Sequence, residues 1–330
     1  MKNTEIKKFL QLYSRIRQNV LNCKSRCMCK DCDETAINSH LLQKNGILSR
    51  IFESGHVYEP RQNDLLNDSF GLSPFGFKKV GINKALSISL FCNKHDTTIF
   101  KEIETKDADL TSYRSHLLLT YRTTCAEKRR KEREIEICKR VLNSNILRSQ
   151  YGSRLQFMKD LQDGFTYGNL DLEKYKNKLE AEIENPSEAF VFYDRNFPIS
   201  GIYASSTFSL TDDSSLVDLD SPLGLFILHI IPEKNGSKII LGYEKKYVKS
   251  WQKNYIERII NVDDNTIEEY LTSLFIRVNG WGISPNVFNQ LSKDKIDYFF
   301  KLFEEDIFNI ISEDYTFNLF DGALLRANNN

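Results

Sequence analysis

The chain has 330 residues, of which 41% are hydrophobic and 27% are charged, and this composition excludes a largely disordered or collagen-like protein. The length is sufficient for two or three domains, each with its own core. We expect neither a signal peptide nor a membrane span, because the longest strongly apolar run, residues 223–231, is too short to cross a bilayer. Clustered thiols without a regular disulfide framework suit a reducing compartment, so a soluble, cytoplasmic protein is expected.

The net charge of zero is unevenly distributed along the chain. Lys and Arg outnumber Asp and Glu by 27 to 17 in residues 1–150, whereas residues 151–330 have 18 basic and 28 acidic side chains. A basic half is typical of proteins that bind nucleic acid, although opposite charges can also serve to pack the two halves together. The acidic half is a candidate surface for a protein partner or for self-association.

Residues 3–21 have apolar side chains at helical spacing and predict an amphipathic helix. It leads into a cysteine-rich segment with Cys27, Cys29 and Cys32. The charged residues between these sulfurs argue against simple burial, and thiolates are ligands that zinc prefers. A separation of two residues favours Cys29 and Cys32 as the ligands, with Cys27 as the alternative to Cys29. Cys23 is the weakest candidate.

A second group of candidate ligands follows a predicted strand. Residues 36–40 resemble a short strand that ends at His40, and residues 43–72 predict a short helix near 46–52 followed by a long loop. The alternating pattern of residues 85–91 indicates a strand that runs into Cys92, and a helix is expected over 96–103. Cys92 and His95 repeat the spacing of Cys29 and Cys32, so these four residues could complete a structural zinc site.

The segments Cys29–Cys32, Ser39–His40 and Cys92–Asp96 resemble the zinc-stapled treble-clef arrangement of HNH-like, or ββα-metal, nucleases. The run 36–48 is also similar to a motif of uncharacterised bacterial HNH-like proteins, some of them associated with anti-phage defence. The resemblance covers about residues 20–107. It implies a metal-dependent endonuclease that acts on nucleic acid. We expect DNA as the partner in preference to RNA. His40 would be the general base, and Asp96 would hold a catalytic Mg²⁺ or Mn²⁺.

Two features separate the chain from that family. Ser87 stands about where the family has its middle asparagine, with Asn83 and Asn45 as the nearest substitutes, and the segment between His40 and Cys92 is long. His40 could instead cap a helix or serve as a spare zinc ligand. The alternative to a nuclease is therefore a non-catalytic, zinc-dependent module that binds nucleic acid or protein.

The other histidines and cysteines have simpler interpretations. His56 could join a second metal but is more typical of a surface loop, and His116 and His229 lie on apolar faces of predicted elements. Cys125 and Cys138 occupy helical positions far from any histidine, which predicts ordinary burial.

The rest of the chain predicts helices and then a sheet. A long helix is expected over 107–145. Its middle, residues 127–134, is charged and predicts ion pairs at i and i+4: Glu127 with Lys131, Lys128 with Glu132, and Arg130 with Glu134. A second helix is expected over 171–184. After Pro186 the strand-rich runs are 189–193, 201–210, 223–231 and 237–243, the last two forming a hairpin. Helices are expected at 246–260, 266–278, 284–291 and from 292 onward, and Ser284 followed by Pro285 predicts the cap and the first residue of the third of these helices.

We therefore predict an α+β protein with three parts. Residues 1–107 would form a treble-clef, ββα-metal zinc module with a leading helix, residues 108–185 a region of long central helices, and residues 186–330 an antiparallel sheet covered by helices, of unknown role.

Overall fold

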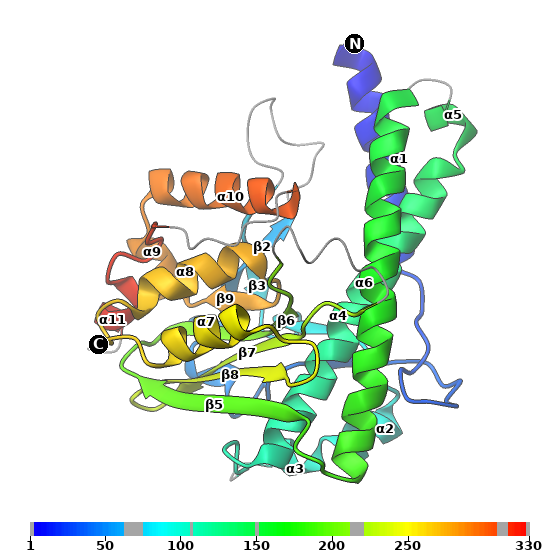
Figure 1. Ribbon diagram of the computed structural model, residues 1–330. Helices are drawn as coiled ribbons and strands as arrows, with labels where there is room; N and C mark the ends of the chain where they lie inside the picture. The colour runs from blue at the N-terminus through cyan, green and yellow to red at the C-terminus, as the bar shows by residue number, and fades with distance from the viewer. Residues whose placement is uncertain are drawn as a thin grey trace.

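The computed structural model describes residues 3–62, 75–105, 108–148, 152–211, 221–308 and 316–327. These residues form an α+β fold, as predicted, built on an antiparallel sheet with the strand order β3-β2-β9-β6-β7-β8-β5 (Figure 1). The strands of this sheet are β2 (His56–Gln62), β3 (Phe75–Gly81), β5 (Phe190–Phe197), β6 (Ile202–Phe208), β7 (Phe226–Glu233), β8 (Gly236–Glu244) and β9 (Trp281–Ile283). A separate pair, β1 (Asn38–His40) and β4 (Ser87–Ser89), forms a second, two-stranded sheet.

The large sheet separates two hydrophobic cores. Along β7, Phe226, Leu228 and Ile230 face one core, whereas Ile227 and Ile231 face the other. This follows from the two-residue period of a strand, and it explains why a strand covered on both sides is apolar at nearly every position. The predicted hairpin of β7 and β8 is confirmed, with Glu233 opposite Gly236.

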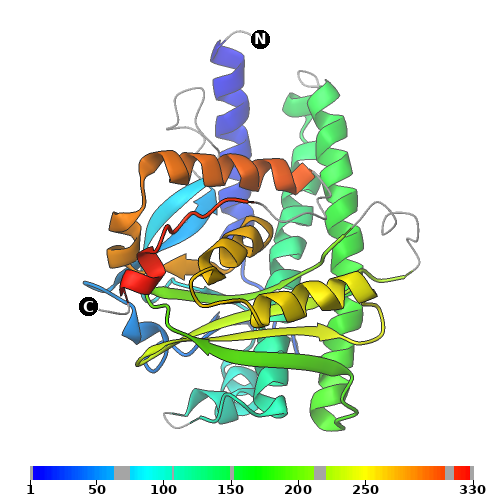
Figure 2. The ribbon, with the colours of Figure 1, turned by 60° about the vertical axis from the view of Figure 1, so that its left-hand side comes forward.

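Helices cover the two faces of the sheet in different ways (Figures 1 and 2). One face packs against the C-terminal helices: α7 (Ser250–Ile260), α8 (Ile267–Arg277), α9 (Pro285–Gln290), α10 (Lys293–Phe308) and α11 (Ala323–Ala327). The other face packs against the N-terminal cysteine-rich module and the long helices α4 (Tyr113–Leu142) and α6 (Gly152–Glu184), which run side by side. Ser284 caps α9 as predicted, since its hydroxyl accepts a hydrogen bond from the Val287 N–H.

A helical arm extends beyond the sheet (Figure 2). It consists of α1 (Asn3–Leu21), α5 (Asn145–Arg148) and the adjoining ends of α4 and α6, joined by a small core that includes Val20, Ile137 and Met158. The sequence predicted only the part of α6 from residue 171, because the preceding stretch contains the poor helix formers Gly164 and Gly168. Packing against the rest of the arm compensates for these glycines.

The prediction of a long loop after residue 52 was wrong for the part that the structure describes; residues 63–72 of that loop lie outside the described residues. The segment contains a 3₁₀ turn, η1 (Leu48–Arg50), and then β2, which β3 follows, and these two strands form an edge of the large sheet. Glu59 and Pro60 obscure the strand pattern of β2 in the sequence. Strand β9, which the sequence did not reveal, joins β2 to β6, so the sheet includes strands from both sides of the predicted boundary at residue 107.

Candidate metal centre

The two-stranded sheet of β1 and β4 and the helix after it position the candidate ligands. In the antiparallel register of the two strands, His40 lies opposite Ser87 and Asn38 opposite Ser89. The cysteine-rich segment is attached to the end of β4, because the Met28 N–H donates to the Leu90 carbonyl over 2.9 Å. Helix α2 (Asn93–Ile99), followed by α3 (Lys101–Glu104), then begins directly after Cys92. The first turn of α2 therefore faces the cysteine-rich segment.

Cys27, Cys32, Cys92 and His95, hereafter the Cys3His cluster, have ligand atoms that all lie within 4.8 Å of one another. The Nδ1 of His95 is 3.4 Å from the Cys27 Sγ and 3.3 Å from the Cys92 Sγ, and the sulfurs of Cys32 and Cys92 are 4.0 Å apart. Around a tetrahedral zinc ion, with Zn–S about 2.3 Å and Zn–N about 2.0 Å, neighbouring ligand atoms are about 3.5–3.8 Å apart. The donor set and its spacing therefore fit a closed structural zinc site.

The electrostatics of the cluster favour a cation. The backbone N–H of His95, at the start of α2, lowers the pKa of the Cys92 thiol and so favours the thiolate. The backbone N–H of Glu34 likewise lowers the pKa of the Cys32 thiol. Partial desolvation and the adjacent Cys27 and Cys92 thiols outweigh this effect, so the pKa of Cys32 is raised. Three thiolates held this close together repel one another, and a divalent cation would remove that repulsion.

Cys29 was favoured over Cys27 from spacing alone, and the structure reverses this choice. Cys29 is outside the Cys3His cluster, and its side chain packs against the core between the sheet and α4. Burial, followed by the nearby Cys27, raises the pKa of the Cys29 thiol to about 12. The reason is the local backbone: the Cys27 N–H donates to the Glu34 carbonyl and Asp31 has a φ of 56°, so a small hairpin brings Cys27 beside Cys32.

His40 is half-buried at the end of β1, and its Nε2 lies 3.0 Å from the carbonyl oxygen of Ile82. A carbonyl oxygen can only accept, so Nε2 carries the hydrogen and Nδ1 is left as the basic nitrogen of the neutral ring. His40 is not part of the Cys3His cluster. The structure therefore does not support the alternative in which His40 is a spare zinc ligand.

Asp96 follows the last ligand of the cluster and faces a buried arginine. Its Oδ1 is 3.9 Å from Nη2 of Arg122, which is only 2% exposed, and this oxygen is buried and accepts no hydrogen bond from a described residue. Arg122 also binds Glu104 over 2.5 Å and lies 3.9 Å above the Phe100 ring. His40 and Asp96 are not hydrogen-bonded to each other in the described part of the chain. Among the described residues, the Cys3His cluster is the one group of three or more potential metal ligands.

Four of the remaining histidines and cysteines lie where the sequence indicated. His116 and His229 are buried, and His229 Nδ1 lies 3.1 Å from the Ser205 hydroxyl. Cys125 and Cys138 are buried as well. His56 is partly exposed beside the Ser54 carbonyl, but it is the first residue of β2 and not part of a loop as expected.

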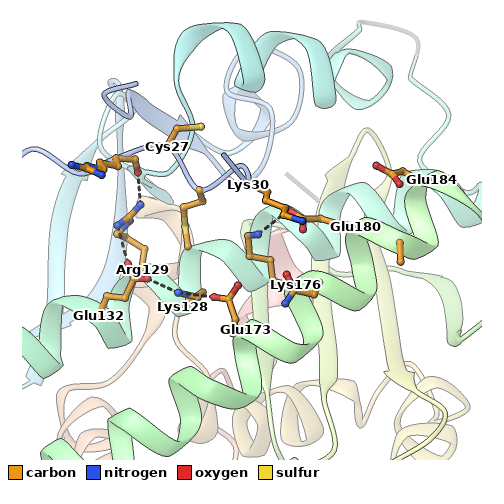
Figure 3. Close-up of a pocket in the computed structure, with 13 residues that line it drawn as sticks. Cys27, Lys30, Lys128, Arg129, Glu132, Glu173, Lys176, Glu180 and Glu184 are labelled. Carbon is orange, nitrogen blue, oxygen red and sulfur yellow. Dashed lines mark hydrogen bonds and ion pairs between the residues drawn. The ribbon is translucent and has the colours of Figure 1, made fainter. Parts of the chain in front are cut away.

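A cleft of about 770 Å³ lies between the cysteine-rich segment, α4 and α6 (Figure 3). Its charged side chains largely neutralise one another: Lys128 binds Glu132 and Glu173, and Lys176 binds Glu180. The predicted pairs of Lys128 with Glu132 and of Glu127 with Lys131 are confirmed. The predicted pair of Arg130 with Glu134 is wrong, because Arg130 binds Glu127 and Glu134 binds Arg17 of the neighbouring helix α1.

No protein-family model, curated protein or solved structure matches this chain. Among the described helices, none combines the length and the apolar character that crossing a bilayer requires.

Proposed function

We propose that this chain is a metal-dependent, HNH-like endonuclease that cleaves nucleic acid, and that the Cys3His cluster holds a structural zinc ion. One observation carries the proposal: the cluster attaches the two-stranded sheet of β1 and β4 to a helix, and β1 ends at a histidine whose Nδ1 is left as a base. The order of strand, histidine, strand and helix is the arrangement that the resemblance implied.

In this proposal zinc stabilises the fold and takes no part in the reaction. His40 Nδ1 accepts the proton of a water molecule as the water oxygen bonds to phosphorus and the bond to the leaving oxygen breaks. The Ile82 carbonyl, which accepts from Nε2, orients the ring and stabilises the imidazolium that forms. Asp96 is the candidate ligand for Mg²⁺ or Mn²⁺, which would supply charge stabilisation of the leaving oxygen. The Asp96 oxygen without a donor is consistent with a hard cation there.

A second candidate is a non-catalytic zinc module that binds nucleic acid or protein. Two observations favour it: Asp96 already faces the positive charge of Arg122, and Ser87 lies directly opposite His40 where the family has an asparagine nearby. In this candidate His40 has only a structural role, as a donor to the turn that contains Ile82.

The deciding experiment compares the zinc-loaded protein with its His40→Ala variant on plasmid DNA and on RNA, with Mg²⁺ or Mn²⁺. His56→Ala is the matched control, since His56 is a partly exposed histidine outside the cluster. We expect His40→Ala to reduce cleavage by at least about 100-fold, the contribution of a general base, with unchanged zinc content. We expect DNA to be the substrate. Binding without cleavage under either metal would favour the second candidate.

The proposal also includes a biological setting. We place this activity in the bacterial cytoplasm and in anti-phage defence, with the acidic half of the chain as the candidate surface for a protein partner or for self-association. A phage plaque assay in cells that express the wild type or His40→Ala tests this setting. Protection that is equal for both proteins would argue against a role for cleavage.

A further inference from the structure

A short turn beside His40 connects β3, at the edge of the large sheet, to β4 of the zinc module. The turn contains residues 81–84, closed by the Lys84 N–H donating to the Gly81 carbonyl. Three side chains from two preceding strands donate to its backbone: His40 to Ile82 and Asn38 to Asn83 from β1, and Arg61 to Lys84 from β2. The turn therefore has a defined position relative to His40.

Lysine side chains surround this turn. The Nζ of Lys44 lies 3.2 Å from Oδ1 of Asn83, and Lys84 is itself a turn residue and is exposed. Lys78 is exposed on β3, three residues before Gly81. None of these three lysines forms an ion pair with a residue in the described ranges, so their charges are available to an anion.

The strand geometry of β3 places Lys78 on the face of the large sheet that packs against the zinc module, the module to which His40 belongs. Phe75 and Phe77 pack against the core beneath the C-terminal helices, whereas Val80 packs against the core that contains the zinc module. Because side chains alternate along a strand, Lys78 shares the face of Val80, and Lys79 shares the opposite face with Phe77. Figure 2 shows β2 and β3 at the edge of the sheet, beside α10.

A buried carboxylate holds this region in place. Glu59, which lies opposite Lys78 in the register of β2 and β3, is 6% exposed. It accepts hydrogen bonds of 2.7 Å from the Leu86 N–H and from the Tyr203 hydroxyl, and it forms an ion pair with Arg61. Its charge is thereby neutralised, so the net charge of this surface comes from the lysines.

We propose that Lys44, Lys78 and Lys84 bind consecutive phosphates of a nucleic acid and hold its backbone beside His40. The inference deepens the proposed function and rests on it: we favour nucleic acid over other polyanions because the three lysines lie near His40, the proposed base. Lysine ammonium groups act as point charges toward phosphate and do not read the base sequence. The surface would therefore contribute affinity without sequence specificity.

The test is a binding titration of the full-length, zinc-loaded protein without added Mg²⁺ or Mn²⁺. The probes are a short labelled DNA duplex and a labelled single-stranded RNA, over about 50 to 200 mM salt. The test variant is Lys44→Ala/Lys78→Ala/Lys84→Ala, and the matched control is Lys79→Ala, the adjacent lysine on the other face of β3. Zinc content and thermal unfolding verify that both variants are folded.

Each phosphate contact contributes about 0.7 to the slope of log K against log salt for single-stranded RNA and about 0.9 for the DNA duplex, so the triple variant should lose about 2.7 from the slope for DNA. Extrapolated from a common affinity at 1 M salt, this corresponds to a loss of about 100-fold at 0.15 M salt. Lys79→Ala should bind as the wild type does. The probe that shows the larger effect identifies DNA or RNA as the ligand.

An unchanged slope in the triple variant, or an equal loss in Lys79→Ala, overturns the inference. So does binding to phosphatidylserine vesicles without binding to either nucleic acid. The binding surface and the proposed function can fail independently. If the wild-type protein binds nucleic acid through these lysines but does not cleave it, the nuclease proposal is contradicted and the binding surface stands. If cleavage does not depend on the lysines, the binding surface is contradicted and the nuclease proposal stands.

Discussion

The Sγ of Cys27 lies 3.4 Å from the Nδ1 of His95, although the two residues are 68 positions apart in the chain. This contact joins the cysteine-rich segment to the first turn of α2. It makes Cys27 a member of the Cys3His cluster and leaves the neighbouring Cys29 outside it.

We predict that Cys27→Ser loses the zinc ion and that Cys29→Ser retains it. Removal of a ligand from a closed site forfeits metal-binding free energy that stabilises the fold, so Cys27→Ser should lower the free energy of unfolding by at least about 3 kcal/mol. Metal analysis and urea unfolding of both variants provide the measurement. Zinc loss in Cys29→Ser with full retention in Cys27→Ser would reverse our assignment.

We predict that Asp96→Asn raises the Mg²⁺ concentration needed for half-maximal cleavage by about tenfold or more, since a hard cation prefers a carboxylate oxygen to an amide. Cleavage rates over a magnesium titration measure this effect, with Glu104→Gln as the control, because both carboxylates face Arg122. If both variants lose stability but keep the same magnesium requirement, Asp96 serves only the ion pair with Arg122.

We predict that Glu59→Ala lowers the free energy of unfolding by about 3–5 kcal/mol, because it leaves the buried Leu86 N–H and Tyr203 hydroxyl without their acceptor. Tyr203→Phe, which removes one hydrogen bond and keeps the ring, should cost only about 1–2 kcal/mol. Urea unfolding measures both, and a double-mutant cycle gives their coupling. Equal effects of the two substitutions would mean that the hydrogen bond from the Leu86 N–H to Glu59 adds no stability beyond that from Tyr203.

We predict a loss of stability in mild acid that depends on His229. Burial, followed by the charge of the nearby His116, lowers the pKa of His229 to about 3. The unfolded chain therefore binds a proton at His229 below about pH 6.5 that the folded protein does not bind, so stability is constant above that pH and falls from there toward pH 3. At about pH 4.5 this residue alone should reduce the free energy of unfolding by about 2–3 kcal/mol.

The matching measurement is urea unfolding of the wild type and of His229→Gln at pH 7 and at about pH 4.5. Whatever the absolute stability of the variant at neutral pH, its free energy of unfolding should decrease between the two pH values by about 2–3 kcal/mol less than that of the wild type. An identical decrease in both proteins would show that His229 is protonated in the folded state.

Local interactions allowed much of this protein to be predicted from its sequence. The helix around residues 113–142, the hairpin of β7 and β8 and the capped helix α9 depend on periodicity, on a tight connection and on a serine before a proline. The residue types of the metal centre were equally visible, because cysteines separated by charged residues are rarely explained by burial.

Only the tertiary structure decided which sulfurs meet. Sequence spacing limits the candidates, but coordination depends on where each side chain points, and the hairpin with its left-handed residue Asp31 brings Cys27 to Cys32 and leaves Cys29 in the core. Strand β2 was likewise hidden, since a buried Glu59 contradicts the strand pattern until Tyr203, 144 residues away, supplies its partner. Long-range contacts of this kind carry no local signal, because the stabilising partner is absent from the surrounding sequence.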